Sequence, residues 1–133
     1  MENAIEINNL RKKFGEFGID NVSFSLPKGF IMGFVGKNGA GKTTTIKAIL
    51  NMLKRDFGEI KIFGKDNITH EAEVKQKIGV VMDSPFYEQE WTLAQTGKVL
   101  KPFYPSWSDE KFNELLRRFQ LDPNKKLRLC HVV

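Results

Sequence analysis

The sequence is poor in cysteine and contains no long apolar run. Cys130 is the single cysteine among the 133 residues, so no disulfide can form within the chain and a reducing compartment is expected. The longest apolar stretch, GFIMGFVG at residues 29–36, is far shorter than the roughly 20 residues that a membrane-spanning helix needs. The polar N-terminus, MENAIEINNL, lacks the apolar segment of a secretion signal. We therefore expect a cytoplasmic protein that is soluble or at most peripheral to a membrane.

Positive charge exceeds negative charge by a modest margin, giving a net charge of +5. The basic residues are spread along the chain, and their densest cluster is Arg11–Lys13. Scattered charge of this kind is typical of a solvated surface, so we expect no nucleic-acid partner. Hydrophobic residues make up 41% of the sequence, which is enough for one globular domain with a single core.

Apolar patterns predict several strands in the first part of the chain. Residues 5–10 and 22–26 alternate apolar and polar side chains, as half-buried strands do, and residues 58–64 form a third short candidate. The runs FIMGFVG at 30–36 and IGVVM at 78–82 are continuously apolar, which is typical of strands buried on both faces.

Helical spacing of apolar residues predicts two helices in the same part of the chain. Residues 42–53 carry such residues on one face, at Ile46, Ile49, Leu50 and Leu53. Residues 69–77 read as a short helix capped by Thr69.

The remainder of the chain predicts helices alone. Thr92 and Gln95 fit a capping box for a helix that runs to about Leu100 and is ended by Pro102. A second capping box begins at Ser106, three residues before Asp109. The helix that follows has one apolar face, formed by Phe112, Leu115, Leu116 and Phe119.

Residues 36–43, GKNGAGKT, match the phosphate-binding pattern G-x-x-x-x-G-K-[ST] in full. Glycines let backbone N–H groups turn inward around phosphates, and the N-terminus of the helix that follows adds its own amides and dipole. In such loops the lysine reaches the β- and γ-phosphates and the hydroxyl coordinates Mg²⁺. A glycine-rich turn that binds nothing is the alternative, but this loop follows an expected buried strand and opens an amphipathic helix. The predicted nucleotide-binding residues here are Gly36, Lys37, Asn38, Gly39, Ala40, Gly41, Lys42, Thr43 and Thr44.

The loop and its flanks together resemble the first half of an ABC transporter ATP-binding subunit. NVSFSLPKGFIMGFV precedes the loop, and GEIKIFGKD and KIGVVMD follow it, in an order and spacing that agree with the family over about residues 3–126. The resemblance implies an α/β P-loop NTPase fold: an antiparallel β subdomain, a partial parallel core, and at residues 92–120 a partial helical subdomain facing a membrane partner. It also implies ATP and Mg²⁺ as cofactors, a transmembrane permease as partner, and a homo- or heterodimer in the full-length form.

Two further site residues are implied by the resemblance. Phe14, in LRKKFGEF, occupies the position of an aromatic residue that stacks on adenine; a core strand position is the alternative, and Phe17 is a less favoured substitute. Asp83 stands where the family usually has a glutamine that helps to ligate Mg²⁺ and couples to the transmembrane domain. A carboxylate suits Mg²⁺, so Thr43 and Asp83 are the predicted metal ligands.

Other functions remain open at this point. Four apolar residues followed by Asp also resemble the Mg²⁺-binding strand of other P-loop enzymes, which would make the protein a small stand-alone kinase or NTPase using Asp83. A nucleotide-binding interaction module is a further alternative.

Several motifs of the family are missing from the 133 residues. We find no L-S-G-G-Q-like signature, no later apolar strand ending in Asp-Glu, and no switch histidine, since His131 lacks the strand context and His70 reads as a surface residue. We therefore expect the chain to bind Mg-ATP or ADP but to hydrolyse ATP poorly or not at all. Residues 1–126 are interpreted as a partial nucleotide-binding domain, and residues 127–133, LRLCHVV, as a divergent tail at a truncation.

Overall fold

The computed structural model describes residues 2–83 and 87–130. The chain divides into two compact units, Met1–Gly79 and Val80–Val133, and each is described by itself. No helix within the described ranges is long and apolar enough to cross a membrane.

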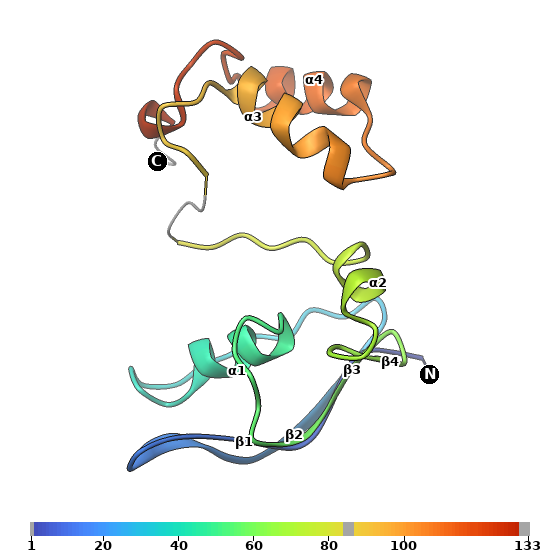
Figure 1. The fold of residues 1–133 in the computed structure, drawn as a ribbon, viewed down its shortest axis with the longest axis vertical. Helices are drawn as coiled ribbons and strands as arrows, with labels where there is room; N and C mark the ends of the chain where they lie inside the picture. Colours follow the sequence, from blue (N-terminus) through green and yellow to red (C-terminus); the bar gives the residue numbers. More distant parts are fainter. Residues whose placement is uncertain (1, 84–86, 131–133) are drawn as a thin grey trace. The chain divides into compact units, whose positions relative to one another are not determined.

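The first unit is built on an antiparallel sheet of four strands (Figure 1). Their spatial order is β2 (Phe17–Pro27), β1 (Asn3–Phe14), β3 (Phe57–Ile62) and β4 (Lys65–Asp66). The strands predicted at 5–10, 22–26 and 58–64 are thus confirmed, and the first two are longer than predicted. Because β1 pairs on both sides, with Ile7 opposite Phe24 of β2 and Ile60 of β3, it forms the centre of the sheet.

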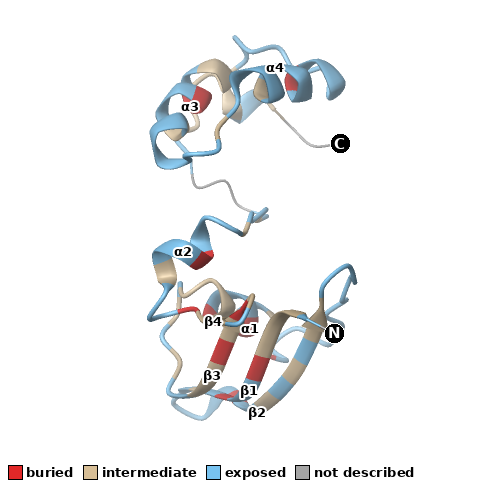
Figure 2. Cartoon of the chain, turned by 90° about the vertical axis from the view of Figure 1, so that its right-hand side faces the viewer, coloured by how far each residue is buried: buried red, intermediate tan, exposed pale blue. Residues whose placement is uncertain are grey.

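The core of this unit lies between the sheet and helix α1 (Lys42–Ile49). Buried apolar residues on β1 and β3 and on α1 mark it in Figure 2. Its members are Ile7, Leu10, Ile19, Ala48 and Ile60. The alternation read from the sequence therefore identified the inward face of the central strand, since Ile7 is 1% exposed.

Helix α1 ends four residues earlier than predicted. Asn51 adopts a left-handed conformation with φ 52°, and the N–H of Met52 bonds to the carbonyl of Lys47 at 2.9 Å while that of Asn51 bonds to Ala48 at 3.1 Å. This pair of bonds is a Schellman motif, which closes a helix C-terminus. Leu53, expected on the apolar face, consequently lies outside the helix.

The prediction of buried strands at residues 30–36 and 78–82 is wrong for this structure. Neither segment has regular secondary structure, and Ile31, Val35 and Val81 are almost fully exposed. A strand exists only where a neighbouring strand completes its hydrogen bonds, and among the described residues the sheet offers these two segments no such neighbour. Apolar composition alone could not supply that information.

The cap predicted for the short helix α2 (Glu71–Lys75) is also wrong. His70 occupies the N-cap position without a side-chain cap. Instead, the carboxylate of Asp66 accepts hydrogen bonds from the N–H groups of Ile68 and Thr69, at 2.9 and 3.0 Å. An ionised carboxylate competes better for backbone donors than a threonine hydroxyl, so Asp66 organises this turn.

The second unit contains α3 (Leu93–Leu100), η1 (Lys101–Phe103), α4 (Asp109–Arg118) and η2 (Leu127–Leu129). The capping box of Thr92 and Gln95 is confirmed, with reciprocal bonds of 3.1 and 2.8 Å. The cap predicted at Ser106 is wrong, because Ser108 is the N-cap and its hydroxyl accepts from the N–H of Lys111 at 3.1 Å. A capping side chain accepts from an N–H two or three residues later, and the helix begins two residues later than we predicted.

The segment before α3 is held by residues near η2. Thr92 and Lys126 form an antiparallel bridge. The N–H of Leu127 bonds to the carbonyl of Trp91 at 2.9 Å, and that of Arg128 to the carbonyl of Gln89 at 3.1 Å. Residues 126–128 are therefore part of the packed second unit.

Candidate functional site

The glycine-rich loop at residues 36–41 has a backbone that requires glycine at two positions. Gly39 and Gly41 have φ values of 83° and 93°, a region that L side chains rarely adopt. Gly41 is also buried as the N-cap of α1, and a Cβ there would come within 2.2 Å of Cγ2 of Ile19 on β2. Only glycine fits this contact, which places the start of α1 directly on the sheet.

Lys42 folds its side chain back over the loop. Its ammonium donates to the carbonyls of Gly36 and Lys37, the second at 2.8 Å. A Cβ on Gly36 would lie 3.3 Å from Cβ of Ala40, so the two ends of the loop approach each other closely. The loop thus forms a tight turn around one positive charge at the N-terminus of a helix.

The hydroxyl residues that follow Lys42 divide into accessible and buried ones. Thr43 is exposed and Thr44 is half-buried, whereas Thr45 is 2% exposed and its Oγ1 donates to the carbonyl of Gly41 at 2.8 Å. Gly41 has no side chain to cap the first-turn N–H groups, and that turn has no acidic residue. The helix N-terminus therefore suits an anionic ligand. The sequence did not single out Thr45, although its i−4 bond is common for threonine in helices.

Phe14 and Phe17 lie at the turn between β1 and β2. Their rings stack with centroids 6.4 Å apart and planes inclined by 22°, and their exposed fractions are 45% and 47%. Phe14 is therefore a strand residue outside the core. In Figure 1 this turn lies at the same end of the first unit as the glycine-rich loop, consistent with the approach of Gly41 to Ile19 on β2.

The Phe14 ring has a cation beside it, from Lys12 two residues earlier on β1. The ammonium of Lys12 lies 5.5 Å from the Phe14 ring centroid and donates to Asp56 Oδ1 at 2.8 Å. This hydrogen bond, together with one from the N–H of Lys13, lowers the pKa of Asp56. Asp56 therefore stays ionised at neutral pH and fixes the end of β1.

The two predicted metal ligands belong to different units. Thr43 lies on α1, and Asp83 is an exposed residue of the second unit. Within the part of the chain that the structure describes, no three His, Cys, Asp or Glu side chains gather where they could hold a metal ion. The pairing of Thr43 and Asp83 around Mg²⁺ stays a prediction. His70 is exposed, as expected, and His131 lies outside the described residues.

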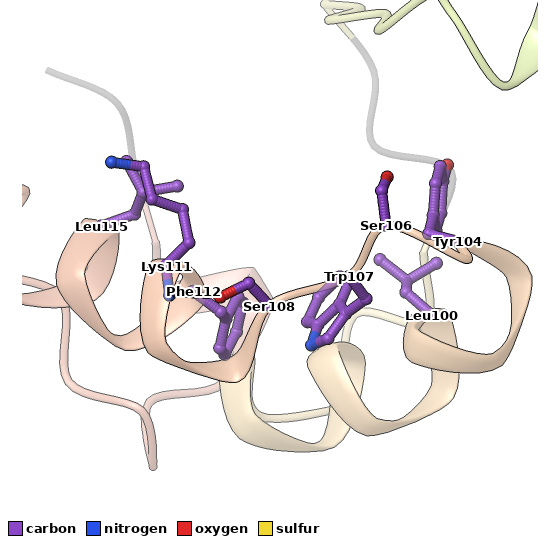
Figure 3. Close-up of a pocket in the computed structure, with 8 residues that line it drawn as sticks. All are labelled: Leu100, Tyr104, Ser106, Trp107, Ser108, Lys111, Phe112 and Leu115. Atoms are coloured by element: carbon purple, nitrogen blue, oxygen red, sulfur yellow. Dashed lines mark hydrogen bonds between the residues drawn. The ribbon is translucent and has the colours of Figure 1, made fainter.

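The second unit has an apolar groove between α3 and α4, with a volume of about 350 Å³ (Figure 3). It runs from Leu100 and Tyr104 past Trp107 to Phe112 and Leu115. The Trp107 indole donates to Asp109 Oδ1 at 2.8 Å and packs on the Phe112 ring at 5.2 Å. These contacts give the groove a fixed aromatic floor.

The sequence profile of the ABC transporter family matches residues 19–131. The chain belongs to this family. Among curated relatives, it is 34% identical over 126 residues to the ABC transporter ATP-binding protein YtrB of Bacillus subtilis (strain 168). It is 37% identical over 89 residues to the bacitracin transport ATP-binding protein BcrA of Bacillus licheniformis. The alignments cover 93% and 65% of this chain, respectively.

Solved structures agree on the fold. An ATP-binding subunit of an ABC transporter superposes with a TM-score of 0.82 over 96% of this chain, at 23% identity. A nucleotide-free ATP-binding cassette from an ABC transporter superposes with a TM-score of 0.72 over 98% of this chain, at 28% identity. The chain thus has the P-loop NTPase fold of ABC cassettes, as predicted, and represents part of that domain.

The chain spans less than half of the curated relatives that it matches here. The alignments cover 42% of YtrB and 29% of BcrA, and 56% and 60% of the two solved chains.

Proposed function

We propose that this chain is the nucleotide-binding part of an ABC transporter ATP-binding subunit, which in its full-length form couples ATP binding and hydrolysis to membrane transport. The observation that carries the proposal is the loop at residues 36–43. Two glycines with positive φ, a lysine folded into the turn and an uncapped helix N-terminus together make a phosphate cradle.

Each predicted residue has a distinct task in this proposal. The backbone N–H groups of residues 36–44 hold the phosphates, and Lys42 exchanges its loop carbonyls for β- and γ-phosphate oxygens. Thr43, whose hydroxyl is exposed at the start of α1, would be one ligand of the metal that accompanies the nucleotide. Asp83 is the second proposed ligand, because a carboxylate suits Mg²⁺. Bound Mg²⁺ would neutralise phosphate charge. The exposed Phe14 ring stacks on adenine, with Phe17 behind it.

We further propose that these 133 residues do not hydrolyse ATP at a measurable rate by themselves. Phosphoryl transfer depends on positioning a water molecule and stabilising transition-state charge. The sequence supplies a ground-state cradle without a signature motif, an Asp-Glu strand end or a switch histidine in strand context. The cradle alone favours binding over turnover.

The proposed partner is a transmembrane permease, which would hold the protein at the cytoplasmic face of the membrane. The α3–α4 groove offers an apolar floor with Lys111 at its side, and Leu115 is an exposed apolar residue along it. The similarity to BcrA, a bacitracin transport ATP-binding protein, supports this assignment. Pairing into a homo- or heterodimer belongs to the full-length form.

Equilibrium dialysis with Mg-ATP tests the binding proposal. Lys42→Ala is expected to weaken ATP binding at least about tenfold, because it removes a charge-assisted contact to phosphate. Lys47→Ala, which removes an exposed lysine from the last turn of the same helix, is the matched control and should bind as the wild type does. Equal affinities for the wild type and Lys42→Ala would show that the loop is not the site.

A further inference from the structure

Asn67 is a buried polar residue that holds the end of α1 opposite the phosphate cradle. It follows β4, is 1% exposed, and donates from Nδ2 to the carbonyls of Ala48 and Ile49, both at 2.8 Å. Both carbonyls belong to the last helical turn, where intrahelical N–H groups are missing; that of Ala48 also accepts from the N–H of Asn51. The N–H of Asn67 bonds to the carbonyl of Ile60 at 3.0 Å, so the amide is fixed to β3.

Arg55 sets the orientation of the Asn67 amide. Its Nη1 donates to Asn67 Oδ1 at 2.6 Å, and its Nη2 donates to Asp66 Oδ2 at 2.7 Å. The guanidinium can only donate, so it forces the oxygen of Asn67 toward itself and the NH₂ group toward the helix. A cation on the amide oxygen also polarises the NH₂ donors that meet the helix carbonyls.

Helix α1 needs this anchor. A helix of eight residues is not stable in isolation, and in α1 only Thr45 and Ala48 are buried. At its N-terminus, Gly41 rests on Ile19; at its C-terminus, Ala48 packs in the core and the Asn67 amide adds the hydrogen bonds that fix the last turn. The direction of the first-turn N–H groups therefore depends on both ends of the helix.

We propose that Asn67, oriented by Arg55, is a positioning residue for phosphate binding: it holds the C-terminus of α1 so that the N-terminal amides point into the cradle. The inference rests on the proposed nucleotide-binding function and adds to it a residue that does not touch nucleotide. Preorganised donors bind an anion more tightly than donors that must first be ordered. The contribution of Asn67 should thus appear in affinity for phosphate-bearing ligands.

The variants separate anchoring from general stability. Asn67→Ala removes the amide, and Arg55→Met removes the orienting charge at similar length, whereas Arg55→Lys keeps the charge. Val74→Ala is the control, because Val74 is buried on α2 at 3% exposure and its N–H bonds to His70 rather than to α1. All are made in the full 133-residue chain and compared at a temperature where each is folded.

Two ligands distinguish the phosphate effect from a loss of fold. ADP and adenosine share the base and ribose, and only ADP reaches the cradle. Asn67→Ala and Arg55→Met should weaken ADP binding about three- to tenfold, as expected for a helix-terminus effect, and leave adenosine binding unchanged in NMR titrations. Arg55→Lys should lie closer to the wild type. Amide hydrogen exchange of residues 43–48, measured without ligand, should be faster in Asn67→Ala.

Three results would overturn this inference but not the proposed function. They are an unchanged ADP affinity in Asn67→Ala, an equal loss of affinity for ADP and for adenosine, or an equal loss of ADP affinity in Val74→Ala. Failure of the wild type to bind ADP would instead overturn the proposed function, and this inference with it.

Discussion

Gly41 is the residue at which the loop, the helix and the sheet meet. Its positive φ and its approach to Ile19 are two separate constraints, whereas Gly39 has a positive φ and no neighbour near its missing side chain. The motif fixes glycine at position 41 and leaves position 39 free, yet the motif gives no reason for this difference. The reason is a contact with β2, more than twenty residues earlier in the chain, which a local pattern does not contain.

Gly41→Ala and Gly39→Ala should therefore differ. Gly39→Ala should cost about 1–2 kcal/mol of unfolding free energy, from backbone strain alone. Gly41→Ala should cost about 2–5 kcal/mol, because overpacking against Ile19 adds to the strain. Urea denaturation followed by the methyl NMR signals of Ile7 and Ile60 reports on the first unit. In an Ile19→Ala background the extra cost of Gly41→Ala should shrink, and an unchanged cost would rule out the steric explanation.

Asp66 should make the first unit less stable at acid pH than at neutral pH. Burial raises the pKa of Asp66, but the N–H groups of Thr69 and Ile68 and then the Arg55 guanidinium outweigh it and lower the pKa from 3.8 to about 2. Because the pKa of Asp66 is lower in the folded state than in the unfolded state, its ionised carboxylate stabilises the fold at pH values above the unfolded-state pKa. This stabilisation is lost as the pH falls from about 4 through about 2. The wild type should lose about 2 kcal/mol of unfolding free energy over this range that Asp66→Asn does not lose. Parallel pH profiles for the two proteins would contradict the assignment.

At the scale of the element, the sequence predicted those helices and strands whose signals are local. The capping box at Thr92 and Gln95 and the alternation at 5–10 both appear in the structure. The end of α1 depends on the left-handed turn at Asn51, and the apolar runs at 30–36 and 78–82 depend on strand partners. The anchor of α1 by Asn67 is likewise non-local, since it joins residues 18 and 19 positions apart.

The packing of α3 on α4 depends on Gly97. A Cβ at Gly97 would lie 2.9 Å from the Phe112 ring, which itself packs on Trp107. Gly97→Ala gains about 1 kcal/mol of helix propensity but must displace this ring, so we expect a net loss of about 1 kcal/mol in the second unit. In a Phe112→Leu background, the same substitution should become stabilising. Urea unfolding followed by tryptophan fluorescence measures both, and a loss of equal size in both backgrounds would exclude the ring contact as the cause.

At the scale of the whole molecule, the chain combines a loop that matches the phosphate-binding motif in full with part of an ABC cassette. The family and the fold follow from sequence because the loop motif and the spacing of its flanks are both specific. The pairing of Thr43 and Asp83 around Mg²⁺ stays a prediction, because the two residues belong to different units. We therefore propose a chain that binds nucleotide but does not carry the groups that stabilise its hydrolysis.

The most direct test of that claim is Mg²⁺-dependent ATP hydrolysis by the purified 133-residue chain, with Lys42→Ala as the control for contaminating enzymes. We predict phosphate release no faster than in the Lys42→Ala sample, although the wild type binds ATP. Clear turnover that Lys42→Ala abolishes would contradict the account, because the chain would then possess its own catalytic arrangement, with Asp83 as the first residue to substitute.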